Sequence, residues 1–580
     1  MKSEVEPDPL DHPIYRTISP SLGKVQSVPQ PRAPELVATP LPRLSQRAII
    51  QSNNNNQIPV GHIQGNHLVH ENRNFRSKRG WNFSISFSVL CLVNLIWAID
   101  SSALPVILPA IAKDLDGSAL QGFWAGTSPL LASTTSQLLW VEIAGVAGRK
   151  RMLSISLSLF AIGATLAAVS SSFAVLLTAR TIQGVGQGGL ISLSQVMLTT
   201  LLSIDDWDRW SRFGYIPWAV GIASSPLISG ILAQSSSWRW VFLVPLPLCL
   251  SALLLIPFSS HPSRGRCDET SELTDIDWLG YVMLIGSTVL VLIPLTWGGV
   301  LYNWASLMTL APLILGIAGF IYLIYTISLF KRPFIRPSYF RGVAGKAAYT
   351  IAFVQGFLFT SSIYSIPLYF EAVKGYAVAI SSAALFVYTF GISSSATVVL
   401  WLTPAFGNCS QWGHIGWLIS TVGTGLLVML APDTSVPGWL FTSTLVGVGL
   451  GIVWSAGAFV VRASSHDQDE IVVDRLYTFF RTAGQTFGVA VSGAILQNTI
   501  KIIVQENMLY APFANQWARY TFILVSAVKD LTTPSDQEVK LLLISAIAKS
   551  LRLVWLVVAV LSAVGGLISA FYIGRKTTGR

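Results

Sequence analysis

The sequence has little charge. Asp, Glu, Lys and Arg make up 11% of its 580 residues, whereas 52% are hydrophobic; a typical soluble domain is about 25% charged. The first 80 residues hold 16 of the 66 charged residues, so only 50 are left for the following 500. So few charges cannot cover a soluble core of that size. The composition therefore excludes a soluble enzyme, a secreted disulfide scaffold and a coiled coil, and it predicts an all-α polytopic membrane protein.

Cysteine pairs, metal-ligand clusters and nucleotide motifs are missing from the sequence. Its four cysteines form no CxxC pair, so neither a metal site nor a disulfide framework is expected. No His-rich or carboxylate cluster with metal spacing occurs in the apolar segments, which argues against a membrane enzyme, and no cofactor is expected. The P-loop pattern GxxxxGK[ST] does not occur, so transport by this chain would use an ion gradient or the substrate's own gradient.

What is abundant is apolar sequence in runs of roughly 20 residues, each long enough to cross about 30 Å of hydrocarbon as a helix. We predict fourteen spans, centred near residues 97, 131, 161, 186, 223, 248, 288, 317, 357, 389, 422, 449, 489 and 561. One of them carries glycines in the order G-x-G-x-x-G, at 184, 186 and 189. Because these lie within an apolar helical run and not between a strand and a helix, they predict close helix packing and not a dinucleotide site.

The net charge of +10 reflects basic residues in loops, which indicates membrane topology and not nucleic-acid binding. Short loops at 149–151 and 331–346 are basic, whereas the short loops predicted to lie on the opposite, outer side of the membrane hold only Lys113, Arg239 and Lys374. This asymmetry predicts that both termini are cytosolic, in the plasma membrane by default or in the vacuolar membrane. Residues 1–80, rich in Pro, Ser and Asn, are expected to form a disordered cytosolic tail, and residues 575–580 a cytosolic carboxyl terminus. The long outer segment 501–548 contains an apolar patch at 520–528 that is too short to span and is expected to form an interfacial or capping helix.

Two ionisable residues interrupt the apolar spans. Asp100 lies in the first span and Arg180 in the fourth, at similar depth on the predicted topology, so they can share one polar cavity. A charged group at the bilayer centre costs about 2.5–3.5 kcal/mol on insertion scales, and it is therefore a functional hypothesis by default. We predict a proton-coupling acid and its charge partner; the alternative is a packing contact that only holds the helices together.

The fifth span is rich in small residues around an internal proline, with Gly221, Pro226 and Gly230 in one run. Such a helix bends and packs closely against its neighbours. It is predicted to act as a gate between lobes, the alternative being a proline kink without a gating role.

Together these motifs resemble the major facilitator superfamily, in particular its fourteen-span drug:proton antiporters common in fungi. Asp100 with Leu108-Pro109 is similar to the family's first-span motif, and Arg180 with Gln183-Gly184 resembles its R-x-x-Q-G motif. The run 221–230 resembles the antiporter motif of span 5, with Ser225 and Ser229 in place of two glycines. The resemblance covers about residues 81–574.

One superfamily motif is incomplete. Gly148-Arg149-Lys150 resembles the end of the loop signature between spans 2 and 3, but the usual acid is Gly145. In the family that acid joins a charge network that locks the lobes together. Glu142 is the nearby acid expected to substitute for it. Arg481, in a later family landmark, is expected to be an interfacial anchor or to take part in coupling.

The resemblance implies a fold of two six-helix lobes with two helices inserted between them. The expected boundaries are 81–258 for the first lobe, 259–330 for a cytosolic loop and the two linker helices, and 331–574 for the second lobe. It also implies a central cavity with alternating access. The aromatic and polar residues expected to face this cavity, or alternatively to pack in the core, are Trp97, Trp124, Gln355, Phe359, Tyr388 and Trp454.

The leading interpretation is a monomeric secondary transporter that exports small, largely apolar molecules such as drugs, toxins or secondary metabolites in exchange for protons. Proton-coupled uptake, for example of an iron-siderophore, and a non-transporting membrane receptor of the same fold are the alternatives.

Overall fold

The structure, a computed structural model, describes residues 81–202, 204–259, 276–329, 335, 337–340, 343–406, 409–463, 470–527 and 537–573. The expected tail 1–80 and carboxyl terminus 575–580 lie outside the described residues. Within the described residues the protein is helical, and the only β-type pairing is an isolated bridge between Gly298 and Tyr302.

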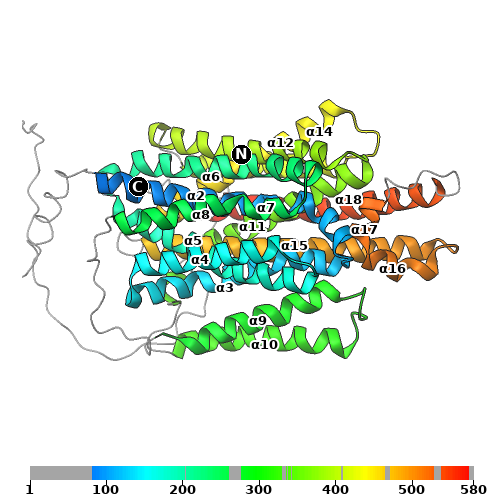
Figure 1. The fold of residues 1–580 in the computed structure, drawn as a ribbon, viewed down its shortest axis with the longest axis horizontal. Coiled ribbons are helices and arrows are strands. Elements are labelled where there is room, and N and C mark those ends of the chain that lie inside the picture. Colours follow the sequence, from blue (N-terminus) through cyan, green and yellow to red (C-terminus); the bar gives the residue numbers. More distant parts are fainter. Residues whose placement is uncertain are drawn as a thin grey trace, which may run out of the picture. The chain divides into compact units, whose positions relative to one another are not determined.

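Helices follow the predicted apolar runs closely (Figure 1). Each of the fourteen predicted centres falls inside one of these helices: α2 (Trp81–Asp114), α3 (Ala119–Ala147), α4 (Arg149–Ala168), α5 (Phe173–Leu201), α6 (Ile204–Ser235), α8 (Pro245–Leu255), α9 (Trp278–Trp297), α10 (Leu307–Leu329), α11 (Val343–Leu368), α12 (Val378–Phe406), α13 (Cys409–Leu427), α14 (Val436–Ala463), α15 (Glu470–Glu506) and α18 (Gln537–Ile568). Twelve helices among the described residues are long and apolar enough to cross a membrane. The two predicted spans outside that set are α5 and α13, which carry more small and polar residues. The all-α polytopic fold class is confirmed.

Short elements complete the chain: α7 (Arg239–Leu243), η2 (Ile256–Phe258), η4 (Pro337–Phe340), η5 (Tyr369–Val373), η6 (Ala511–Phe513), α16 (Ala514–Arg519), α17 (Thr521–Ala527) and η8 (Ser569–Ile573). Helix starts follow local sequence rules. Ser118 caps α3, because its side chain accepts from the Gln121 backbone N–H at 3.3 Å while the Gln121 side chain accepts from the Ser118 N–H at 2.9 Å. This reciprocal capping box satisfies two backbone donors that the first turn leaves open.

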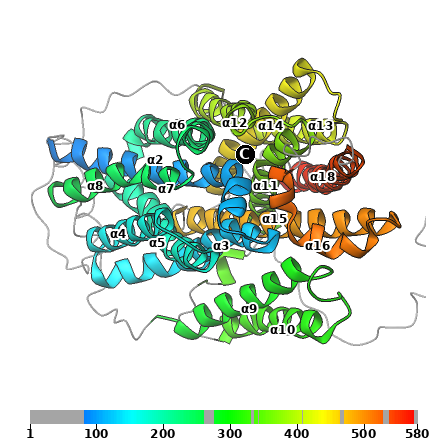
Figure 2. The ribbon, with the colours of Figure 1, turned by 45° about the vertical axis from the view of Figure 1, so that its right-hand side comes forward.

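The helices form two groups. In the first group α2 packs on α6 and α5, and α3 and α4 pack on α5; in the second, α11 packs on α15, and α12 and α13 pack on α14. The groups meet most extensively where α6 packs on α12 and where α3 packs on α15, and smaller contacts join α2 to α11 and α12 and α5 to α15. Helices α9 and α10 pack on each other, lie beside the rest of the bundle in both ribbon views, and contact it through α3 and α15 (Figures 1 and 2).

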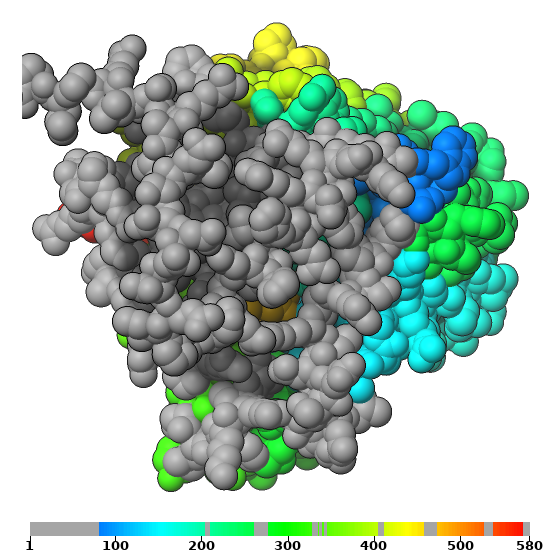
Figure 3. Space-filling model, turned by 90° about the vertical axis from the view of Figure 1, so that its left-hand side faces the viewer, coloured from blue at the N-terminus to red at the C-terminus, as the bar shows by residue number. Residues whose placement is uncertain are grey.

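The outside of the bundle is apolar. Side chains such as Leu254, Ile314 and Ile324 are more than half exposed. Water would disfavour so much exposed apolar surface, whereas hydrocarbon does not, so this surface fits a lipid environment. We call the end of the bundle at which α2 begins the proximal end. Figure 3 views the molecule from that end, with residues of α2 in blue and residues around the α3–α4 junction in cyan at the right of the view.

The described parts of the segment 501–548, at the distal end, are largely helical. α15 continues to Glu506 and α18 already begins at Gln537. The short helix α17 covers most of the apolar patch at 520–528 and packs on α2 and α3. Its Phe522 is 1% exposed, and its ring centroid lies 4.7 Å from that of Phe123. α17 therefore packs into the distal end of the bundle, as a capping helix would.

Candidate central cavity and buried charge site

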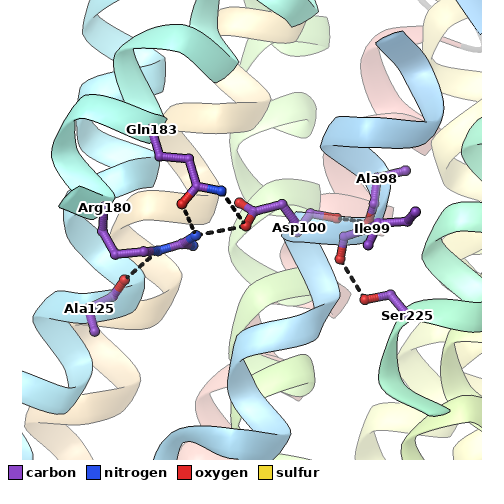
Figure 4. A network of polar contacts seen from close by, with 8 residues as sticks. Ala98, Ile99, Asp100, Ala125, Arg180, Gln183 and Ser225 are labelled. Atoms are coloured by element: carbon purple, nitrogen blue, oxygen red, sulfur yellow. Dashed lines mark hydrogen bonds and ion pairs between the residues drawn. The ribbon is translucent and has the colours of Figure 1, made fainter. Parts of the chain in front are cut away.

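Asp100 and Arg180, predicted from sequence to share one depth, form a direct ion pair. Arg180 Nη1 lies 2.7 Å from Asp100 Oδ1, and Gln183 Nε2 donates to the same oxygen at 2.9 Å. Arg180 Nη1 also donates to Gln183 Oε1 at 2.7 Å, and Arg180 Nε to the Ala125 carbonyl at 3.4 Å. Figure 4 shows this network, with Asp100 on α2 facing Arg180 and Gln183 on α5.

The network is almost completely removed from solvent. Asp100 is 6% exposed, Arg180 3% and Gln183 0%. A buried charge is stable only when it is paired and its remaining hydrogen-bonding groups are satisfied. Asp100, Arg180 and Gln183 pair with and hydrogen-bond one another, which meets that requirement. The Arg180 guanidinium also lies 5.5 Å from the Phe242 ring centroid.

Helix α6 holds the Asp100 segment of α2 in place. Ser225 Oγ donates to the Ile99 carbonyl at 2.5 Å, and Ser102 Oγ donates to the Ile222 carbonyl at 3.2 Å. The two bonds lie on either side of Asp100 in sequence. Ser225 stands where the family motif has glycine, so this departure from the motif adds a hydrogen bond between α6 and α2.

Three adjoining cavities lead from the Asp100 site towards the proximal half of the bundle. The deepest is lined by Asp100, Arg180 and Tyr364, and it shares Ser101, Gln187 and Gln485 with the middle one. The middle cavity shares Trp97, Ile191 and Trp454 with the third, which has an empty volume of about 670 Å³ including space open to solvent. The buried carboxylate is therefore the inner end of a row of cavities between the two helix groups.

The largest of these cavities has an aromatic wall. Trp218 of α6 and Trp454 of α14 stack with centroids 5.0 Å apart and planes 22° apart, and Trp97 lies 6.4 Å from Trp218. The Arg481 guanidinium carbon lies 4.0 Å from the Trp454 ring centroid. Asp474, 7% exposed, also lines this cavity.

The structure places the six predicted cavity residues in three different settings. Trp97, Phe359 and Trp454 line the cavities. Gln355 and Tyr388 are fully buried behind them: Gln355 Oε1 accepts from Tyr477 at 2.9 Å, and the Tyr388 hydroxyl donates to the Phe359 carbonyl at 3.4 Å. Trp124 differs from the expectation. Its indole donates to Thr296 of α9 at 3.1 Å, because that face of α3 packs against a linker helix and not against the central cavity.

The motif residues between α3 and α4 lie at the proximal end. Gly148 ends α3 and begins α4 with φ of +95°, a conformation that glycine adopts without steric cost. Arg149 opens α4, and Lys150 Nζ donates to the Ser259 carbonyl. Glu142 lies beside Tyr281 of α9 and Arg475 of α15, so this acid joins three parts of the bundle.

The small residues of α5 and α6 lie at helix contacts. Gly184 packs on the Pro129 backbone of α3, and Gly221 packs on Ala98 of α2. Gly230 lies against Ser382 of α12, where a Cβ would overlap that side chain, so glycine allows the close approach of the two helix groups. Pro226 is buried within α6, which runs unbroken through it.

Sequence reasoning missed several residues of the cavities, notably Gln187, Trp218, Asp474 and Gln485. A signal for three of them was present. Arg180, Gln183 and Gln187 recur at helical spacing, as do Asp474, Arg481 and Gln485, so each set falls on one helix face. Trp218 offered a weaker signal, since tryptophan in membrane proteins is enriched at the interfaces and this one lies within a span.

Comparisons with known proteins agree with this architecture. The family model for the Major Facilitator Superfamily matches residues 90–461. "MFS transporter L2" of Phoma sp. is 36% identical over 496 residues, covering 85% of this chain and 82% of the relative. "MFS-type efflux pump LUC4" of Fusarium sp. is 28% identical over 546 residues, covering 91% and 95%. An Aspergillus aculeatus transporter named for an acurin A biosynthesis cluster is 28% identical, covering 77% and 80%.

Among solved structures, a bacterial homologue of the human lysosomal transporter Spinster, in an inward-facing and occupied conformation, aligns with a TM-score of 0.56. The alignment covers 85% of this chain and 97% of that one at 14% identity, a likeness that shows the fold alone. The family model, the relatives and the apolar helices lead to one conclusion: this multi-pass membrane protein belongs to the major facilitator superfamily, among relatives named as efflux pumps.

Proposed function

We propose that this chain exports small, largely apolar secondary metabolites from the cytosol in exchange for protons. The observation that carries the proposal is the Asp100–Arg180 ion pair at the inner end of the row of cavities. The relatives named as efflux pumps support export, and the aromatic walls of the cavities suit apolar cargo. The proposed setting is the plasma membrane with both termini cytosolic, as the distribution of Lys and Arg predicts.

Coupling would work through the charge of Asp100. When the carboxylate is ionised, it holds Arg180 and Gln183 and so ties α2 to α5. A proton arriving from outside would neutralise it and remove the attraction to the guanidinium. Because the same cavity is lined by Phe359 and Thr360 of the second helix group, a change in this pair alters the surface at which the two groups meet. The proton and the substrate would each stabilise a different arrangement of the two helix groups. Substrate that binds in the adjoining cavity therefore favours release of the proton to the cytosol.

The two helix groups are the proposed moving lobes, with expected boundaries at 81–258 and 331–574. Threonine and glutamine contacts join them along α15: Gln137 donates to Thr482 at 3.0 Å, and Gln195 donates to Thr478 at 2.9 Å. Such hydrogen bonds between helices are worth on average about 0.6 kcal/mol each in membranes, weak enough to break and form again during a cycle. Glu142, near Arg475, is the proposed substitute for the missing loop acid at the proximal contact.

The test is proton-coupled flux in sealed vesicles that contain the purified protein. A pH gradient is imposed, internal pH is followed with a trapped dye, and a panel of apolar aromatic compounds is added. Asp100→Asn should reduce compound-driven proton movement at least tenfold. The matched control is Asp114→Asn, at the distal end of the same helix, where the carboxylate pairs with Arg239 at 2.8 Å and is half exposed; it should transport like the unchanged protein.

Three results would contradict the proposal. Equal proton movement by Asp100→Asn and the unchanged protein would remove Asp100 as the coupling acid. Compound movement without a proton signal would make the protein a facilitator. Movement of compound and protons in the same direction would replace export by uptake.

A further inference from the structure

Arg481 is a buried arginine that has no counter-ion in the described part of the chain. It is 9% exposed, and within the described residues no carboxylate or other side chain forms an ion pair or hydrogen bond with its guanidinium. Its contacts are aromatic: the Trp454 ring centroid at 4.0 Å and the Tyr477 ring centroid at 5.6 Å. A cation over an aromatic face gains about 2 kcal/mol when desolvated, which is far less than the desolvation penalty of a buried ion. The site is therefore electrostatically incomplete as it stands.

The geometry leaves the hydrogen-bonding edge of Arg481 available. The five N–H donors of a guanidinium lie in its plane, and in the described part of the chain no acceptor bonds those of Arg481, whose guanidinium carbon lies 4.0 Å from the Trp454 ring centroid. Arg481 lines the largest cavity, so its unused donors border the space into which a ligand would fit. Planar, paired donors are the arrangement that binds a carboxylate through two parallel hydrogen bonds.

The remaining wall of the cavity fits a flat ring. Trp97 and Trp218 line it, and Trp97 is only half buried, so part of its surface faces the space. The Trp218 indole N–H is a second buried donor with no acceptor among the described residues. Aromatic pairs stabilise contacts by about 0.5–1.5 kcal/mol beyond their area. The cavity thus combines an aromatic wall with a guanidinium that has no hydrogen-bond partner among the described residues.

The other charged residue of the cavity, Asp474, forms no ion pair with Arg481 in the structure. Asp474 is seven residues earlier on α15, which places it about 10 Å away along the helix axis at ~1.5 Å per residue. We infer that this cavity binds aromatic anions, with the anionic group on Arg481 and the ring against Trp97 and Trp218.

The inference rests on the proposed function, since it names the chemical class of the exported substrate, but binding itself needs no gradient. The test is therefore equilibrium dialysis of the purified full-length protein in detergent at pH 7, with empty micelles as the blank. Three tritiated probes of one shape are compared: 2-naphthoate, neutral 2-naphthamide and cationic 2-naphthylmethylamine. The unchanged protein should bind 2-naphthoate about tenfold more tightly than the amide, and the amine least tightly, because a charged hydrogen bond replaces a neutral one.

Two substitutions locate the preference. Arg481→Gln should bring 2-naphthoate and 2-naphthamide to equal affinity, and Arg481→Lys should keep a reduced preference because it retains charge without the planar donors. The matched control is Arg212→Gln, since the Arg212 guanidinium also lies over a tryptophan, 5.2 Å from the Trp401 centroid, but does not line this cavity. That variant should keep the tenfold preference.

Equal affinity of the unchanged protein for the three probes, or no binding of any of them, overturns the inference, as does a preference that survives in Arg481→Gln. The first two of these results are measured on the unchanged chain, so they do not depend on whether a variant folds. Failure here is distinct from failure of the export proposal. Proton-driven flux of neutral compounds with no anion preference would overturn the anion site alone, whereas anion binding without any flux would overturn export alone.

Discussion

Two buried arginines, one in each helix group, differ in their partners. Arg180 has a carboxylate at 2.7 Å, a glutamine and a backbone carbonyl as partners. Arg481 is about as buried but lies on a tryptophan ring, with no ion pair among the described residues. A charge that is satisfied inside the protein can be switched by a proton. A charge left unsatisfied beside a cavity is available to a ligand. The comparison separates the proposed coupling site from the proposed substrate site.

The largest expected effect is on stability, and it should differ between the two arginines. Arg180→Gln leaves the Asp100 carboxylate buried without its cation, which should destabilise the protein by about 3–5 kcal/mol. Arg481→Gln should change stability by less than about 2 kcal/mol, because loss of the cation–π contact is offset by removal of a buried charge that has no ion pair among the described residues. Thermal unfolding of the purified proteins in detergent measures both.

A double variant checks the cause. Asp100→Asn/Arg180→Gln removes both charges and should recover much of the stability lost in Arg180→Gln alone. If the two arginine variants unfold at the same temperature, the difference between a paired and an unpaired charge has no energetic consequence here.

The second prediction turns the unpaired arginine into a paired one. Gln485 lies one helical turn after Arg481 on α15 and lines the inner cavities, so Gln485→Glu places a carboxylate on the same helix face. The new acid should compete for the guanidinium and remove the roughly tenfold preference for 2-naphthoate over 2-naphthamide. Dialysis with the same probes measures this. Retention of the full preference by Gln485→Glu would mean that the anion does not bind through Arg481.

The smallest effect concerns how the paired site is held. Ser225→Ala removes the hydrogen bond to the Ile99 carbonyl beside Asp100 and should destabilise the protein by about 1 kcal/mol. Ser224→Ala is the matched control, because Ser224 is partly exposed and bonds only the Val220 carbonyl of its own helix at 2.7 Å. Unfolding temperatures that fall equally in both variants would show that the bond between α6 and α2 is worth no more than a local one.

Much of the fold and part of the site could be predicted. The fourteen apolar runs correspond to helices because a chain in hydrocarbon must satisfy its backbone hydrogen bonds within each segment. Asp100 and Arg180 could be paired from sequence because charge in a span is rare and both lay at one depth. Trp124 and Trp218 show where this reasoning stops. Both are tryptophans within spans, yet the residue predicted for the cavity donates to a linker helix, and the one passed over forms the cavity wall.

The sequence by itself determined where the fourteen long helices lie, their order and the presence of one acid and one arginine at matching depth, since these depend on the positions and lengths of the apolar runs. Only the tertiary structure decided which face of each helix meets the cavity. A soluble helix reveals its buried face by polarity, but a membrane helix is apolar on its lipid side as well as on its packed side. Helix rotation is therefore set by contacts such as Gly230 against Ser382 and Ser225 against Ile99. The packed structure brings Arg180 to Asp100 and places Arg481 at the edge of the cavity.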